Sequence, residues 1–178
     1  MRKISLLVSL CSVLLLGLFV FAAAQSKASY AGTWALDKAK SEGLSQRLQG
    51  ADSVSWVVTQ DDKQLTREQK VEGGQGGQGG GRGAGMGAGQ LTVKLDGSET
   101  STDRPQISGK STTKATWQDG GKILEVSTVT TGNIQGNDFK ATTTEHWELA
   151  EGGKVLKVHQ KAESPRGTTE SKMVFTKK

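Results

Sequence analysis

Residues 146–176 read HWELAEGGKVLKVHQKAESPRGTTESKMVFT, and this stretch decides the fold. Apolar and polar side chains alternate on both sides of two turn signals, Gly152-Gly153 and the tetrapeptide from Ser164 to Gly167. Alternation with a period of two is typical of strands that have one buried face. The stretch therefore predicts three antiparallel strands joined by two tight hairpins.

The first of these turns also predicts which residues face one another. A two-residue glycine loop permits positive φ at both central positions, and so it fixes how the flanking strands pair. It places Trp147 opposite Val158, and the second turn places Met173 beside Val158. Two independent turns thus predict the same apolar face across three strands. Its members are Trp147, Leu149, Leu156, Val158, Met173 and Phe175.

A second glycine pair, Gly120-Gly121, lies in a similar setting. It predicts a hairpin in which Trp117 faces Leu124. A tryptophan, a Gly-Gly-Lys turn and alternating aliphatic residues occur in both places. We therefore expect one hairpin design to be used twice.

Alternation of this kind recurs along most of the chain, and only Lys38 to Leu48 looks helical. We expect an all-β fold, an antiparallel meander of roughly eight to ten strands closed into a barrel, with one short helix after the first strand. A β-sandwich is the alternative. The predicted strands are Tyr30 to Leu36, Ser53 to Gln60, Gln64 to Glu72, Leu91 to Leu95, Ser98 to Asp103, Ser111 to Gln118, Lys122 to Thr131, Asp138 to Leu149, Lys154 to Glu163 and Thr168 to Thr176.

The N-terminus has the three parts of a secretory signal. Two basic residues precede the apolar stretch from Ile4 to Phe21, and small residues end the segment at Ala24. We expect residues 1–24 to be a signal peptide, and residues 25–178 to form a single domain that is periplasmic or secreted. The alternative is an uncleaved signal that anchors the chain, since about 20 apolar residues span a bilayer.

Cysteine content and charge exclude several classes of function. The only cysteine, Cys11, lies in the predicted signal peptide, so the mature chain has no thiol for a disulfide or a zinc site. The formal net charge of +5 falls to about +3 when Arg2 and Lys3 leave with the signal. Acidic and basic residues are interspersed, whereas nucleic-acid binders concentrate basic residues on one stripe. We expect no nucleic-acid partner, and membrane contact only through an uncleaved signal.

Residues 73–90 read GGQGGQGGGRGAGMGAGQ. Gly74 to Gly79 formally match G-x-G-x-x-G, but a dinucleotide-binding fingerprint needs a helix after it, and here a strand follows. Such a composition behaves as a flexible coil. We expect a flexible loop that joins two strands, with a contact surface for a protein partner as the alternative.

The segment SYAGTWALDKAKSEGLSQRL, residues 29–48, carries a resemblance. Gly32-Thr33-Trp34 resembles the G-x-W of the calycin superfamily, the lipocalins and fatty-acid-binding proteins, in which a short helical segment and a β-barrel follow. An indole near the end of a barrel can fill it while its N–H bonds to a backbone acceptor. The resemblance implies a barrel with an interior ligand. The chain departs from the pattern because its last residues offer no arginine to cover Trp34.

The same region is also similar to a group of small exported bacterial proteins of unassigned function. These proteins begin with GTW-x-L-[DN]-x-x-K-S, which Gly32 to Ser41 match. That resemblance implies export and no particular activity.

The candidate ligand site is inside the predicted barrel. The turn at Asp61 to Lys63 brings Arg67 to the same inward face as Trp56. Interior arginines of fatty-acid-binding proteins meet the ligand carboxylate, so the resemblance implies a ligand role for Arg67. Glu145 also faces inward and would neutralise Arg67 without a ligand; a structural pair, a position at the barrel mouth and a different register are the alternatives. The candidate ligand-binding residues are Arg67, Trp56, Trp34 and Glu145, with plain core as the alternative for the tryptophans.

Two histidines are the remaining chemistry-bearing residues. His146 and His159 face each other in the predicted register, but both point outward if Trp147 points inward, and Lys172 joins their row. Two imidazoles are an incomplete metal site. No nucleophile elbow and no H-E-x-x-H motif occurs. We expect no metal, no cofactor and no enzymatic activity.

These observations predict an exported, non-catalytic binding module, with a small apolar or amphiphilic molecule held in the barrel. The alternative is a protein-interaction or cell-envelope assembly module that uses a sheet edge or the glycine-rich loop.

Overall fold

The computed structural model describes residues 27–73, 89–134 and 136–178. The predicted signal peptide and nearly all of the glycine-rich run lie outside these residues. Within them, no helix is long and apolar enough to cross a membrane.

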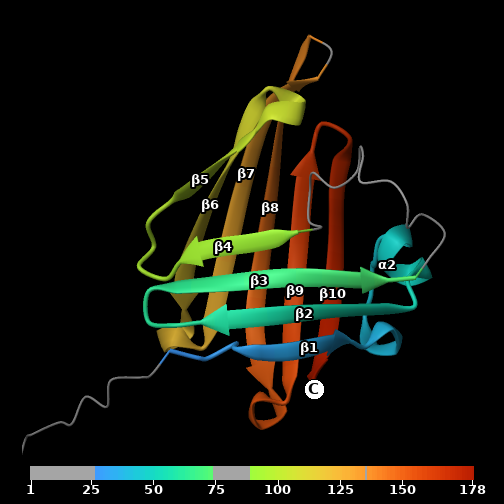
Figure 1. The fold of residues 1–178 in the computed structure, drawn as a ribbon, viewed down its shortest axis with the longest axis vertical. Coiled ribbons are helices and arrows are strands. Elements are labelled where there is room, and N and C mark those ends of the chain that lie inside the picture. Colours follow the sequence, from blue (N-terminus) through green and yellow to red (C-terminus); the bar gives the residue numbers. More distant parts are fainter. Residues whose placement is uncertain (1–26, 74–88, 135) are drawn as a thin grey trace, which may run out of the picture.

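In the described residues, ten antiparallel strands form one continuous sheet in the order β4-β3-β2-β1-β10-β9-β8-β7-β6-β5. The sheet curves into a nearly closed barrel, in which β1 to β4 run across β6 to β10 (Figure 1). The predicted all-β meander is confirmed. The strands form one continuous sheet and not the two separate sheets of a β-sandwich, which was the alternative. The strands are β1 (Gly32–Leu36), β2 (Ser53–Gln60), β3 (Gln64–Glu72), β4 (Gln90–Lys94), β5 (Thr100–Arg104), β6 (Gly109–Gln118), β7 (Ile123–Ile134), β8 (Asn137–Ala150), β9 (Val155–Ser164) and β10 (Gly167–Lys177).

The predicted helix from Lys38 to Leu48 is wrong in its extent. The segment contains a 3₁₀ turn at Lys38–Lys40 and a short helix, α2 (Gln46–Gly50). Between them, Glu42 bonds to the backbone of Lys172, with N–H···O distances of 2.8 and 2.9 Å. These two hydrogen bonds pair backbone groups on the edge of β10 that lie beyond the end of β1. This tertiary pairing overrides the local preference of the segment for a helix.

Both predicted hairpin registers are confirmed. Trp147 pairs with Val158 across the β8–β9 hairpin, and Trp117 pairs with Leu124 across β6–β7. Each loop has four residues rather than two, because the residue before each glycine pair also adopts a positive φ: 46° at Asp119 and 51° at Glu151. The register is unchanged because the loop grows by one residue on each side.

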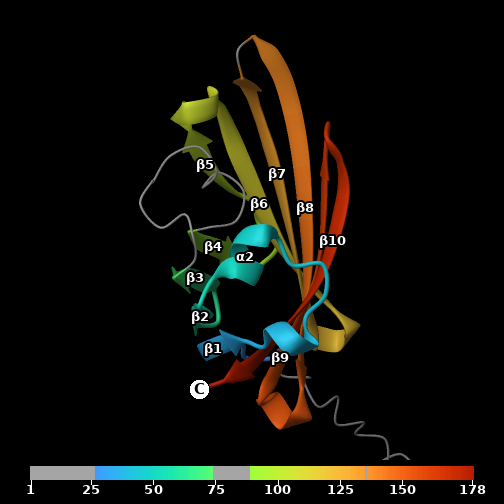
Figure 2. The same cartoon turned by 90° about the vertical axis from the view of Figure 1, so that its right-hand side faces the viewer.

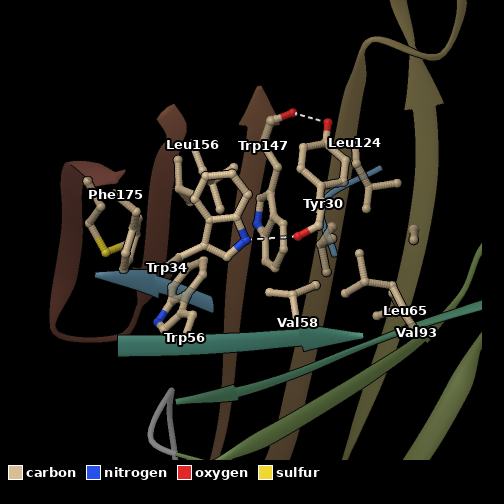
Figure 3. Close-up of a cluster of buried hydrophobic side chains, with 14 of the residues drawn as sticks. Tyr30, Trp34, Trp56, Val58, Leu65, Val93, Leu124, Trp147, Leu156 and Phe175 are labelled. Carbon is tan, nitrogen blue, oxygen red and sulfur yellow. Dashed lines mark hydrogen bonds between the residues drawn. The ribbon is translucent and has the colours of Figure 1, made fainter. Parts of the chain in front are cut away.

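The core lies between the two crossing layers of strands, in the lower part of the barrel (Figures 1 and 3). Trp34 and Trp147 are fully buried, and Trp56 is 1 % exposed. The Trp34 indole N–H donates to the backbone oxygen of Tyr30 at 2.8 Å, as the sequence predicted. Although the chain ends without an arginine, the Lys177 ammonium lies 5.2 Å from the centre of the Trp34 ring and covers it instead. The apolar half of the barrel is thus filled by its own side chains.

Tyr30 ties the segment before β1 to the far layer of the sheet. Its hydroxyl donates to the carbonyl oxygen of Trp147 at 2.7 Å, and the Lys122 oxygen lies 3.0 Å away (Figure 3). The ring stacks on Trp117 with centroids 6.0 Å apart. Burial raises the pKa of the Tyr30 hydroxyl well above its usual range, because the phenolate would lose its hydration.

We expect this raised pKa to make the fold sensitive to alkali. A group whose pKa is higher in the folded state stabilises the fold below its unfolded pKa and loses that contribution as pH rises. Stability should therefore fall above about pH 10, the usual pKa of tyrosine. Tyr30 is the only tyrosine, so tyrosinate absorbance at about pH 11 should appear only after unfolding. The Tyr30→Phe variant should lose less stability between about pH 9 and 11; an equal loss would contradict the assignment.

Candidate ligand-binding site in the barrel interior

The inner surface of the barrel changes its chemistry halfway along the long strands. From the lower end, β8 turns Leu149 and Trp147 inward, then Glu145 and Thr143. β9 changes at the same level, from Val158 to Gln160, whereas β7 changes one level higher, from Val126 to Thr128. The lower half is therefore apolar, and the upper half is polar.

Just above this boundary, one residue from each of six neighbouring strands lies in a continuous row across the inner surface. Five of the six are threonines, and Ala162 of β9 is the exception. We call the five the threonine row. They are Thr100, Thr113, Thr128, Thr143 and Thr169.

Hydroxyl groups of this region bond to one another across strands. The Thr113 and Thr128 hydroxyl oxygens lie 3.1 Å apart. One level higher, the Ser111 and Thr130 hydroxyls lie 2.9 Å apart, and Arg104 Nε donates to Ser111 at 3.1 Å. Buried hydroxyls need such partners, since an unpaired one is costly. The upper wall is therefore an organised polar surface.

The strands β1 to β4 face only the lower part of β6 to β10 (Figures 1 and 2). Accordingly, Thr128, Thr143 and Gln160 are only partly buried although they point inward, whereas Trp147 and Leu124 are fully buried. Ser111, Thr113 and Thr130 beside them are buried. Among the described residues, the polar half of the inner surface is therefore accessible in part, whereas the apolar half is packed.

A buried ion pair marks the boundary between the two halves. Arg67 of β3 and Glu145 of β8 are 5 % and 6 % exposed. Arg67 Nη1 donates to both carboxylate oxygens, at 3.2 and 3.0 Å. Gln160 Nε2 and the Trp147 indole N–H donate to the same carboxylate, at 3.0 and 2.8 Å. The Glu145 carboxylate thus receives hydrogen bonds from three side chains.

Aromatic rings enclose the guanidinium of Arg67. Its central carbon lies 4.4 Å from the centre of the Trp56 ring and 5.8 Å from that of Trp147. The Trp56 indole N–H donates to Gln69 Oε1 at 2.9 Å. Cation–π contact of this kind favours a desolvated arginine. The pair and its surroundings are therefore rigidly held.

Two polar atoms of this region have no hydrogen-bond partner among the described residues. They are Arg67 Nε and the hydroxyl oxygen of Thr100, both buried. Such atoms are uncommon in folded proteins, because each costs about 1–3 kcal/mol when unpaired. The Nε–H of Arg67 is thus a donor that lacks an acceptor.

The structure brings three of the four predicted site residues together: Arg67, Glu145 and Trp56. The fourth, Trp34, lies in the packed core with its N–H bonded within the chain. Gln160 and the threonine row were not among the residues predicted from the sequence. The predicted register already contained the information needed to place this row. Four of the threonines lie four residues from a core residue that was predicted to face inward, and the fifth, Thr100, pairs with one of these four, Thr113.

The histidines lie on the outer surface, as predicted. His146 pairs with His159, and Lys172 follows on β10. His146 Nε2 lies 3.0 Å from a Glu125 carboxylate oxygen, and His159 Nε2 lies 3.8 Å from Glu170. Within the described ranges, no cluster of three or more His, Cys, Asp or Glu side chains could hold a metal ion.

Comparison with known proteins gives a structural likeness and no sequence relative. No family model matches the chain, and no curated protein matches it. Among solved structures, the chain is similar to zebrafish ileal bile acid-binding protein complexed with cholic acid, with 13 % sequence identity and a TM-score of 0.47. The match covers 85 % of this chain and 100 % of that chain. The predicted link to the exported bacterial group gains no support from these comparisons.

Proposed function

We propose that the protein is an exported, non-catalytic binding module that holds a small amphiphilic molecule in the upper half of the barrel. The observation that carries this proposal is the partly accessible polar inner surface that begins at the buried Arg67–Glu145 pair. The proposal that the protein is exported depends on the predicted signal peptide, residues 1–24.

The inner surface suits an amphiphile because its two sides differ. On β3 and β4, Val71 and Leu91 face inward and remain partly exposed. On β5 to β10, the threonine row offers hydroxyl donors and acceptors. A molecule placed between them would bury apolar atoms on one side and hydrogen-bond on the other. Ligand sites commonly combine apolar walls with a few fixed polar groups.

A binding role fits the chemistry of the pair better than catalysis does. The Glu145 carboxylate already accepts bonds from Arg67, Gln160 and Trp147. A general base needs a lone pair within reach of a substrate proton, and this carboxylate is fully engaged. We therefore propose a role in recognition for the pair.

The test is native mass spectrometry of the chain from Gln25 onward, followed by extraction of any bound molecule. We expect one small molecule per chain. Thr143→Val, which removes an inward hydroxyl, should lower its occupancy at least about threefold, the effect of one lost hydrogen bond. Thr144→Val, which makes the same change on the outer face, should leave occupancy unchanged. Equal occupancy in both variants, or failure to bind any added amphiphile, would contradict the proposal.

A second candidate is a protein-interaction module. Among the strands that the structure describes, β4 and β5 end the sheet, and each has one paired neighbour there. Free edges of this kind can accept a strand from another chain. If the native mass is that of the chain alone, a pull-down that compares wild type with Ser101→Pro, a change on the β5 edge, tests this candidate. Equal capture by both would reject the β5 edge.

A further inference from the structure

We propose that the polar head of the ligand is uncharged and carries an oxygen acceptor, as in an alcohol or an ester, and is not a carboxylate. This inference rests on the proposed function. It differs from the role that the sequence resemblance implied for Arg67, which was to meet a carboxylate.

The first argument is the charge of the site. Arg67 and Glu145 lie within 3.0 Å of each other and are both buried, so together they present no net charge. Above the pair, the only other charged residue that the described strands turn inward is Arg104. It lies at the far end of β5, where its Nε donates to Ser111. The positive charge of Arg67 is therefore already neutralised by the carboxylate of Glu145.

The second argument is the cost of placing an anion here. A carboxylate that approached Arg67 would also approach the negative Glu145. It would lose its hydration without gaining a free cation, and burial of a charge is expensive unless it is paired. A neutral oxygen loses far less hydration on the same path.

The third argument is the inventory of free hydrogen-bonding groups. The Glu145 carboxylate is saturated by three donors, whereas Arg67 Nε lacks an acceptor among the described residues. A carbonyl or hydroxyl oxygen supplies that acceptor. The hydroxyl oxygen of Thr100, which also lacks a partner, both donates and accepts. Either buried atom would be satisfied by an uncharged oxygen that reached it, such as that of an alcohol or an ester.

Two probes with the same acyl chain test the inference: monolaurin, which has a neutral glycerol ester head, and laurate, which is an anion. Isothermal titration of the chain from Gln25 onward, below the micelle concentration of each probe, gives both affinities. We expect monolaurin to bind at least about tenfold tighter, or about 1.4 kcal/mol.

The Glu145→Gln variant removes the negative charge and leaves Arg67 positive. We expect its affinity for laurate to rise at least about tenfold and the preference to shift towards laurate. The matched control is Glu148→Gln. This residue lies on the same strand but points outward and pairs with Lys157, so the ratio of the two affinities should stay at the wild-type value.

The outcomes separate the inference from the proposed function. Tighter binding of laurate by the wild type, or an unchanged ratio in folded Glu145→Gln, overturns the neutral head and leaves the binding module standing. If the wild type binds neither probe, the proposed function fails and the inference fails with it. If Glu145→Gln does not fold, the wild-type ratio alone decides.

Discussion

Replacement of Trp147 by alanine is expected to lower the free energy of unfolding by about 3–5 kcal/mol. The side chain is fully buried. Its ring lies 5.1 Å from that of Trp56 and 5.7 Å from that of Tyr30, centre to centre. Loss of the indole leaves a large cavity between the two layers of strands, and it also removes one donor from Glu145. Cavity formation and the lost hydrogen bond act in the same direction.

Urea denaturation followed by far-ultraviolet circular dichroism measures this change without depending on tryptophan fluorescence. The neighbouring residue Glu148 points outward and is exposed, so Glu148→Ala should alter stability by no more than about 0.5 kcal/mol. If Trp147→Ala costs less than about 1 kcal/mol, the inward orientation of Trp147 is incorrect.

Either partner of the buried ion pair should be as sensitive as Trp147. We expect Arg67→Met or Glu145→Leu alone to lower the free energy of unfolding by about 3–5 kcal/mol, because each leaves one charge buried without its counterion. The double variant should lose far less than the sum, since apolar residues of similar size replace the pair without leaving a charge. A double-mutant cycle from denaturation curves measures the coupling.

The exposed pair Lys161–Glu163 provides the comparison. Its charged atoms are closer, at 2.7 Å, but both side chains are about half exposed. Solvent screens such pairs, so its coupling energy should be far smaller than that between Arg67 and Glu145. Additive losses for Arg67 and Glu145 would show that they do not form a buried pair in solution.

The sequence predicted the strands and their registers because turn glycines and alternation are local signals. The glycine pair at 152–153 was enough to place Trp147 opposite Val158. By contrast, the bond between Arg67 and Glu145 crosses from one layer of the barrel to the other. Alternation shows that both residues point inward, but only the curvature of the whole sheet shows that they meet.

The predicted extent of the helix was wrong for a related reason, although one short helix does follow the first strand. Composition favoured a helix through Glu42, but its backbone pairs with Lys172, a partner that is remote in the sequence. Gly43 follows with a φ of 66°, and a Cβ atom there would lie 2.3 Å from the Glu170 carbonyl oxygen. The close approach to β10 thus requires glycine, and α2 begins only after it, at Gln46, with Ser45 as its N-cap.

The strand order also has a consequence for the rate at which the barrel forms. Every pairing but one joins strands that are consecutive in the sequence, and the exception is β1 with β10. Hairpins between consecutive strands close on a microsecond scale, whereas contacts across almost the whole chain pay a larger loop-closure entropy first. The pairing of β1 with β10 is therefore the one that cannot form until the last residues of the chain are in place. Without the pairing of Trp34 with Lys177, the strands would form two separate sheets, β1 to β4 and β5 to β10, and their apolar faces would not be held against each other.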